Sequence, residues 1–459
     1  MRKKALLALM MAAILLLSGC ALIKKDQAVD DATEIIRMGD QVITKKEVKA
    51  LAESVLSSYS QNMQMYYSQS IDVTDPQYIS MAQEEAISQY KNDLALTAKA
   101  KELGLDQLTE EELEAVKTSA QEELTYYQDY AKLLNQSALE GKSDEEVAQF
   151  VNELIESNGI TLDSLTEAAT KNAIDKKLKD YAVKDITVTD EEIQADYDSK
   201  VEANKTTYSE NPGSWATAAN NKSTLYYTPA GVRRVKQILI KFKDEDQTAI
   251  DDANKQLKDA NSALSSAQAK VDSAQSTVDT EGITDEDKAK AEETLAAAKQ
   301  ELDEADKAVQ AATQAVTEAT DKAFANIDEK ADSVLALLAE ENADWQKIMD
   351  ENNEDSGMKD NEKGYAVAAG MTNFDAAFVD AAMALEKIGD ISPKTKGVYG
   401  YYIIRYDSDE AEGPVALDAV KETISSALLS TKQDDAYEAA KTQWVEEAGI
   451  KVDLNALKD

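Results

Sequence analysis

The 459-residue sequence contains no histidine and a single cysteine, Cys20. Without histidine, neither a Ser-His-Asp triad nor a histidine-ligated zinc site can form. With one cysteine, an intramolecular disulfide and a cysteine metal site are excluded as well. A metal could bind only through oxygen ligands, and no carboxylate-rich segment has the spacing of a calcium-binding loop. We therefore expect no metal ion and no other cofactor.

Positive charge is also scarce. The chain has 49 Lys and Arg residues against 88 Asp and Glu residues, a formal net charge of −39 at pH 7. Such a charge repels nucleic acids and anionic lipid headgroups. We therefore expect no nucleic-acid partner and no flat binding of the folded chain to a membrane surface.

Residues 1–20 are typical of a bacterial lipoprotein signal peptide. A basic start is followed by an apolar run over 5–17, which is too short to favour a membrane span. The tetrapeptide over 17–20 matches a lipobox, and this resemblance implies cleavage before Cys20 and lipidation of its thiol. The lipid would anchor the chain to the outer face of the cell membrane. The alternatives are an ordinary secretory signal or a buried, unmodified cysteine. Residues 21–34 are polar and indicate a flexible tether.

The next part of the chain has a mostly helical pattern. A short hairpin is expected to turn at Gly39-Asp40. Capping boxes then predict helix starts after three threonines. These are Thr44, Thr109 and Thr189. We expect a loop-rich connector over 211–231, and, near the C-terminus, a helix over 415–447 followed by a strand over 450–453 that pairs with the N-terminal hairpin.

Residues 246–325 carry a seven-residue repeat. Bulky apolar residues recur every seven positions over 250–278 and over 295–316, and alanines follow most of them three positions later. This pattern predicts an antiparallel helical hairpin with alternating large and small layers, broken near Gly282. At about 1.5 Å per residue, an arm of roughly 30 residues would project some 45 Å. The hairpin is either a docking arm or a spacer in a tolerated loop, and its polar outer faces slightly favour the spacer.

Two segments resemble the first and last strands of a parvulin prolyl isomerase domain. They are Val235-Lys236-Gln237-Ile238-Leu239-Ile240 and Tyr399-Gly400-Tyr401-Tyr402-Ile403-Ile404. Three further segments precede them in the order found in PrsA-like foldase lipoproteins and SurA-type chaperones. They are Gly39-Asp40-Gln41-Val42-Ile43-Thr44, Leu103-Gly104-Leu105 and Ile186-Thr187-Val188-Thr189-Asp190-Glu191-Glu192-Ile193. The chain resembles that family over nearly its whole length after residue 20, except 246–325.

The resemblance implies an α+β fold. Residues 35–230 would form a mainly helical trigger-factor/SurA-like peptide-binding module. Residues 231–409 would be an inserted parvulin-like α+β domain that itself carries the long hairpin of 246–325, and 410–459 would return to the module as a helix and a strand. The implied partners are unfolded or partly folded secreted proteins, the implied location is outside the cytoplasm, and a dimer stays an open alternative.

The resemblance also locates a degenerate site. Typical parvulins have histidines where Gln237 and Tyr402 stand here, and Asp355 lies in a segment that resembles the family's acidic loop. Gln237 and Tyr402 can exchange a hydrogen bond but cannot reproduce the charge of an imidazole pair. The pocket for the proline ring would be formed by four further side chains. These are Phe378, Met371, Phe374 and Met383. The structural alternative is that Gln237 and Tyr402 only bond neighbouring strands and that Phe378 and Met383 only pack a core.

A second candidate site is the helical module, where Tyr and Met recur. The chain has 19 Tyr and 5 Phe, so most aromatic side chains carry a polar tip. Adaptable Met and amphipathic Tyr side chains suit weak binding of varied unfolded segments, although such residues more often pack a helix bundle. The candidates are Tyr59, Met63, Met65, Tyr66, Tyr67, Met81, Tyr90, Tyr126, Tyr127 and Tyr130.

Three functions are compatible with these observations. The favoured one is a lipid-anchored extracytoplasmic chaperone that assists the folding of secreted proteins, with weak or absent prolyl isomerase activity. The second is an active isomerase with a remodelled site. The third is a surface scaffold that recruits a partner through the hairpin.

Overall fold

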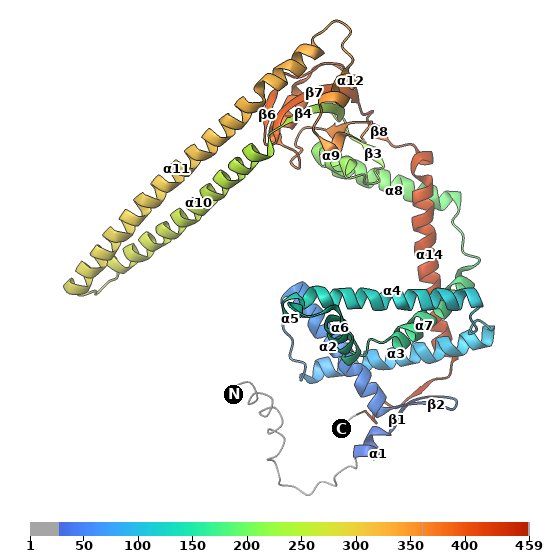
Figure 1. Cartoon of the computed structure of the whole chain (residues 1–459). Helices are drawn as coiled ribbons and strands as arrows, with labels where there is room; N and C mark the ends of the chain where they lie inside the picture. The colour runs from blue at the N-terminus through green and yellow to red at the C-terminus, as the bar shows by residue number, and fades with distance from the viewer. Residues whose placement is uncertain (1–26, 360, 458–459) are drawn as a thin grey trace. The chain divides into compact units, whose positions relative to one another are not determined.

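The computed structural model describes residues 27–359 and 361–457 (Figure 1). The expected signal peptide and the lipidation site Cys20 lie outside the described residues. The described chain is mainly helical, and its small sheets are antiparallel, so the fold is α+β. It divides into two compact units, one with the described residues of Met1–Thr187 and Ala427–Asp459, the other with those of Val188–Ser426. We call them unit 1 and unit 2.

Unit 1 begins with the hairpin that the sequence predicts. Strands β1 (Glu34–Met38) and β2 (Gln41–Thr44) join at Gly39, whose φ of 59° suits glycine. Strand β9 (Lys451–Val452) pairs antiparallel with the other edge of β1. The buried Ile35 and Ile36 of β1 pack with apolar side chains of α2 (Lys45–Tyr67) and α3 (Pro76–Leu103).

The remaining helices of unit 1 are α4 (Glu110–Leu134), α5 (Gln136–Leu139), α6 (Asp144–Ser157) and α7 (Leu162–Val183). Thr44 and Thr109 form the predicted capping boxes of α2 and α4, because each hydroxyl accepts from a backbone N–H while a glutamate carboxylate accepts from the threonine N–H. Thr189 does the same for α8 in unit 2.

The described part of the expected tether is folded. Residues 27–34 form the short helix α1 (Gln27–Asp31) and the start of β1. The Lys45 ammonium, fully buried, lies 3.1 Å from the Asp30 carboxylate. A buried ammonium needs such a partner, so this ion pair ties α1 to the start of α2.

Unit 2 is built on a four-stranded sheet in the order β5-β4-β7-β6. Its strands are β4 (Arg233–Lys241), β5 (Tyr365–Val367), β6 (Thr395–Gly397) and β7 (Gly400–Asp409). Successive side chains of a strand point to opposite faces. Ile238 and Ile240 of β4 therefore belong to one core, with the helical hairpin, while Val235 and Leu239 belong to a second core on the other face.

The connector expected over 211–231 is more regular than the sequence suggested. After α8 (Asp190–Tyr208), it contains α9 (Pro212–Asn220) and β3 (Tyr227–Thr228), which pairs with β8 (Gly413–Pro414). Helix α9 buries Trp215, whose indole N–H donates to the Tyr227 carbonyl at 2.7 Å. Both α8 and α9 belong to unit 2, whose limits therefore extend beyond 231–409.

Helix α9 is fixed against β5 and the loop that follows. The Asn220 side-chain amide donates to the Ala366 carbonyl at 2.9 Å and accepts from the Ala366 N–H at 2.8 Å. A Cβ at Gly213 would lie only 2.3 Å from the Met371 backbone nitrogen, so the backbones approach too closely for any other residue. Helix α9 is thus an integral part of the second core.

A long helical hairpin follows β4. Helices α10 (Asp244–Val278) and α11 (Asp285–Leu338) lie side by side, with Thr284 capping the second one (Figure 1). The small layer of the repeat is buried between them, including Ala267, Ala274 and Ala298. Helix α11 continues to Leu338, and α12 (Trp345–Asn352) is separate. The apolar pattern of the sequence predicts one helix over 331–349, and the break between α11 and α12 shows that this prediction is wrong.

A 3₁₀ turn (Ser356–Met358), α13 (Ala376–Ala384) and α14 (Leu417–Glu447) complete the described elements. Within residues 27–359 and 361–457, no helix combines the length and the apolar character needed to cross a membrane.

Candidate functional site

The candidate site lies on the face of the sheet that carries the second core. Gln237 projects from β4 and is 7% exposed. Its Nε2 donates to Asp355 Oδ2 at 2.7 Å, and the Tyr365 hydroxyl donates to the same oxygen at 2.9 Å. Asp355 Oδ1 accepts from the Gly357 N–H at 2.9 Å. Gln237 and Asp355, both named from the sequence, are therefore joined directly, and Tyr365 completes the group.

Tyr402 belongs to a different hydrogen-bonded group. Its hydroxyl donates to Asp375 Oδ2 at 3.0 Å, and the Val398 N–H donates to the same oxygen at 2.8 Å. The expected hydrogen bond between Gln237 and Tyr402 is wrong. The reason is the register of β4 and β7, which places Ile404 opposite Gln237 and Leu239 opposite Tyr402. Instead, Gln237 donates to Asp355 and Tyr402 donates to Asp375.

A closed aromatic cluster joins the two groups. The Phe378 ring lies 5.6 Å from the rings of Phe374 and Tyr402 and 6.2 Å from Tyr365, measured between centroids. These tilted and edge-to-face contacts are typical of a packed aromatic core. Phe378 and Met371 are buried, and the half-buried Phe374 and Met383 pack against the same core. Trp215 of α9 belongs to this core as well. The four side chains expected to line a proline pocket thus belong to one core, with Phe378 and Met371 buried in it and Phe374 and Met383 at its partly exposed edge.

Both phenols of the site are held as neutral donors. Burial, followed by the hydrogen bond to Asp375, raises the pKa of Tyr402 far above its ordinary value. Burial and the nearby Asp355 carboxylate raise the pKa of Tyr365 in the same way. At neutral pH the site therefore offers hydroxyl donors, both already engaged with carboxylates. The one acceptor left over is Gln237 Oε1, which is buried and has no hydrogen-bond partner among the described residues.

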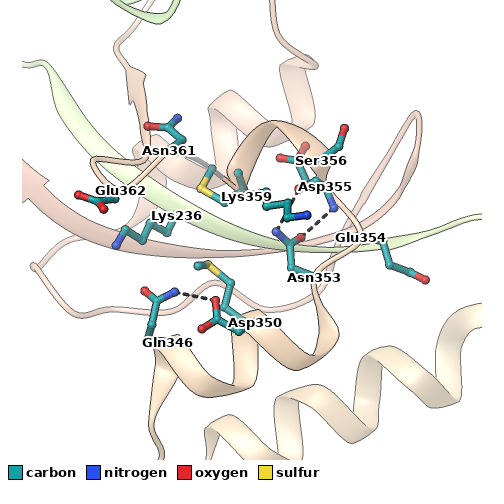
Figure 2. Close-up of a pocket in the computed structure, with 12 residues that line it drawn as sticks. Lys236, Gln346, Asp350, Asn353, Glu354, Asp355, Ser356, Lys359, Asn361 and Glu362 are labelled. Carbon is teal, nitrogen blue, oxygen red and sulfur yellow. Dashed lines mark hydrogen bonds between the residues drawn. The ribbon is translucent and has the colours of Figure 1, made fainter.

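A polar pocket of about 730 Å³ adjoins the Asp355 loop (Figure 2). Figure 2 shows Lys236 and Gln346 at its edge, with Gln346 Nε2 donating to Asp350 Oδ1 at 2.8 Å. Lys236 precedes Gln237 on β4, so the two side chains leave opposite faces of the sheet. The pocket also touches Met349 and Met358 of the hairpin-side core, and it does not open onto the aromatic cluster.

Among the described residues, no group of three or more His, Cys, Asp or Glu side chains is arranged to hold a metal ion. The carboxylates of the site serve other purposes. Asp355 and Asp375 each accept backbone and side-chain hydrogen bonds that organise neighbouring loops.

Sequence reasoning missed Tyr365 and Asp375. Asp375 caps α13, because its Oδ1 accepts from the Ala377 N–H at 3.0 Å. An aspartate directly before an apolar helical run is a recognisable capping signal, but its contact with Tyr402, 27 positions away, is not. Tyr365 follows Gly364 in the short edge strand β5, and nothing in its immediate sequence indicates a bond to Asp355.

Comparisons with known proteins relate the chain to foldase proteins. No family model matches it. It is 36% identical over 111 residues to the foldase protein PrsA of Clostridium botulinum strain 657, a segment that spans 24% of this chain and 32% of the clostridial protein. It is 31% identical over 134 residues to foldase protein PrsA 2 of Listeria innocua, or 29% of this chain and 45% of that protein. The chain is thus a partial homologue of PrsA foldases and spans about a third of the clostridial relatives it matches.

Two solved structures align with most of the chain. The PrsA structure from Streptococcus pneumoniae covers 93% of this chain and 97% of its own, at 14% identity and a TM-score of 0.22. A structure described as a SurA-like chaperone of Campylobacter jejuni covers 92% and 100%, at 14% identity and a TM-score of 0.24. At such low scores the chains do not superpose as wholes, and the homology stands on the shared sequence segment.

Proposed function

We propose that the protein is a chaperone of the PrsA/SurA type that holds unfolded or partly folded secreted proteins, with weak or absent prolyl isomerase activity. Unit 1 would supply the peptide-binding surface, and the sheet of unit 2 would be a parvulin-like scaffold inserted in the chain with its helical hairpin. Cys20 would carry the lipid that anchors the protein to the outer face of the cell membrane.

One observation carries this proposal: unit 1 exposes large apolar side chains at the ends of two helices. The end of α2 exposes Met65, Tyr66 and Tyr67, each more than two-thirds exposed, and we call these three residues the α2 patch. The end of α4 exposes four more side chains, the α4 patch. They are Tyr126, Tyr130, Leu133 and Leu134. Exposed apolar groups gathered in this way are typical of surfaces that bind other chains.

The composition of the patches suits varied clients. Tyr126 and Tyr130 stack with centroids 6.2 Å apart, which gives a broad face with two hydroxyl groups. Tyrosine and methionine bind apolar segments without demanding one shape. The other candidates are more enclosed, since Tyr90 packs in the core of α2 and α3 and Tyr127 in that of α4 and α6. The alternative that such residues only pack a helix bundle therefore applies to Tyr90 and Tyr127 and not to the α2 and α4 patches.

The site's geometry supports the proposal of weak or absent isomerase activity. A catalyst of proline rotation must bind the twisted amide better than the planar one, in an apolar pocket that excludes water. Here the positions that would form this pocket are filled by Phe378, Met371 and the aromatic neighbours of Phe378. Tyr402 and Gln237 are bonded to carboxylates rather than directed at a substrate.

The test measures two activities of the same full-length preparation. Suppression of the aggregation of a denatured reporter protein should be clear, while a protease-coupled assay of a proline peptide should show little or no acceleration. Isomerisation at the rate of an ordinary parvulin would instead establish the active-isomerase alternative. Absence of any aggregation suppression would overturn the chaperone proposal.

The anchor has a separate test. Mass analysis of the protein from its native membrane should find the chain beginning at Cys20 with a lipid on the thiol. The Cys20→Ser variant should leave the membrane fraction while still suppressing aggregation. Retention of this variant in the membrane would rule out the thioether anchor.

A further inference from the structure

A second pocket, of about 540 Å³, lies where the helical hairpin leaves the sheet of unit 2. It is bounded by the start of α10, by α11 near residue 324, by the turn between β6 and β7, and by the start of α13. We call it the hairpin-base pocket. Its lining includes Phe242, Gln247, Ile250, Phe324, Val398 and Tyr399.

The walls of this pocket are mostly apolar, and one of them is left open to solvent. Phe242 and Phe324 meet edge to face with centroids 4.8 Å apart and are buried. The turn residues Val398 and Tyr399 are 58% and 57% exposed. The firm side of the pocket therefore belongs to the hairpin and β4, and the exposed side belongs to a turn that presents two large apolar side chains.

Gln247, which lines the pocket, carries a hydrogen-bond acceptor without a partner among the described residues. Gln247 Nε2 donates to Asp251 Oδ1 at 2.9 Å, but the buried Gln247 Oε1 has no partner among the described residues. A buried carbonyl without a donor destabilises the folded chain. The Asp375 carboxylate nearby cannot relieve it, because it accepts bonds and already receives three. A ligand that brings an N–H group would satisfy Gln247.

The charge around the pocket selects the kind of ligand. Asp251 and Asp375 line it, and its one lysine, Lys396, is already engaged, lying 4.5 Å from the Phe324 ring centroid and 3.7 Å from the Asp321 carboxylate. Acidic residues far outnumber lysines in α10 and α11, and neither helix contains arginine. The hairpin thus adds a negative field that attracts cationic segments and repels acidic ones.

We infer that the hairpin-base pocket binds an extended peptide segment that places an aliphatic or aromatic side chain against Phe242 and Phe324 and has lysine or arginine on either side. This inference rests on the proposed function, because the segment would belong to an unfolded client. It makes the hairpin one wall of a client site, so it extends beyond the spacer interpretation.

The experiment uses fluorescence anisotropy with a short labelled peptide that has Leu-Phe-Leu at its centre and two lysines at each end. The parent protein is the full chain in which the α2 and α4 patches are replaced by serines, so that unit 1 contributes little binding. The parent should bind this peptide, and a matched peptide with glutamates in place of lysines should bind at least tenfold more weakly.

Two variants test the pocket itself. Val398→Ser with Tyr399→Ser should weaken binding about tenfold, because the open apolar wall is lost. Gln247→Leu should weaken binding several-fold without lowering the melting temperature, since it also removes a buried unpaired carbonyl. The matched control is Ile388→Ser, which changes a side chain of unit 2 that is also 58% exposed and does not line the pocket. It should bind like the parent.

The inference is overturned if the parent does not bind the lysine peptide, if both peptides bind equally, or if the Val398 and Tyr399 double variant binds like the Ile388→Ser control. None of these results bears on aggregation suppression by the unsubstituted chain. Failure of that activity would remove the proposed function, whereas its survival beside a negative peptide result would remove the pocket alone.

Discussion

Tyrosine has opposite surroundings in two regions of the molecule, the aromatic cluster of unit 2 and the α2 and α4 patches of unit 1. In unit 2, Tyr402 and Tyr365 are enclosed with Phe378, and each hydroxyl donates to a carboxylate. In unit 1, Tyr66 and Tyr126 stand in solvent at helix ends. The enclosed tyrosines can only stabilise the fold, because their faces and hydroxyls are already used. The exposed ones contribute little to the fold and are available to another chain. The comparison teaches that burial, rather than residue type, separates the tyrosines of the core from those to which we assign client binding.

The largest effect that this comparison predicts is on stability. Phe378→Ala should destabilise unit 2 by about 3–5 kcal/mol, because it removes a buried ring from the aromatic cluster. Denaturant unfolding followed by tryptophan fluorescence measures this, since Trp215 belongs to the same core. Tyr130→Ala in the α4 patch is the matched control and should change stability by less than about 0.5 kcal/mol. A loss below about 1 kcal/mol for Phe378→Ala would mean that the cluster is open and able to take a ligand.

The next effect is on client binding. Replacing Met65, Tyr66 and Tyr67 together by serine should weaken binding of a denatured reporter about tenfold, or 1.4 kcal/mol, with no loss of stability. The control is Leu454→Ser, which removes another exposed apolar side chain of unit 1. Equal loss in the control would mean that general surface hydrophobicity, rather than the α2 patch, binds clients.

A smaller effect on stability is expected when the hydroxyl group of a single tyrosine is removed. Tyr402→Phe should destabilise unit 2 by roughly 1 kcal/mol, because Asp375 loses one of its three donors and keeps two backbone N–H groups. Tyr126→Phe should change stability by almost nothing, since its hydroxyl faces water. Differential scanning calorimetry measures both. Equal melting temperatures for the two variants would contradict the enclosed role of Tyr402.

The smallest effect is expected from pH. Since the chain has no histidine, stability and any isomerase activity should be nearly constant between pH 6 and 8. The raised pKa values of Tyr365 and Tyr402 mean that the folded state holds their protons more tightly than the unfolded state. Their stabilisation is therefore complete below the ordinary phenol pKa of about 10 and is lost as the pH rises above it. Denaturant midpoints across the pH range measure this, and an inflection between pH 6 and 8 would contradict it.

Local signals predicted the elements well. The capping boxes at Thr44 and Thr109 and the turn at Gly39 depend on neighbouring residues alone, and the structure has all three. The heptad pattern predicted the paired helices α10 and α11 because each layer repeats the same contact. The end of α11 was missed because no glycine or proline separates it from α12. The local signals of the break are weaker ones: Asn342 has a φ of 70°, and the Asp344 side chain caps α12.

The site was harder to predict because it depends on register. A shift of pairing changes which side chains meet across a strand pair, and the sequence does not specify that Leu239, not Gln237, lies opposite Tyr402. The contact between Gln237 and Asp355 joins residues 118 positions apart. The burial of Phe378 also depends on α9, a helix in a segment whose Pro and Gly residues suggested loops. The resemblance indicated the participating residues, while tertiary packing determined their partners.

The two hydrogen bonds between Asn220 and Ala366 have a consequence for the edge of the four-stranded sheet. Ala366 is the middle residue of β5, which is an edge strand of its sheet. The unpaired backbone groups of an edge strand can form hydrogen bonds with another extended polypeptide, which then adds to the sheet as a further strand. The Asn220 carboxamide takes the place of a neighbouring strand, because it donates to the Ala366 carbonyl and accepts from the Ala366 N–H. The outer edge of β5 is therefore closed to an added strand at Ala366.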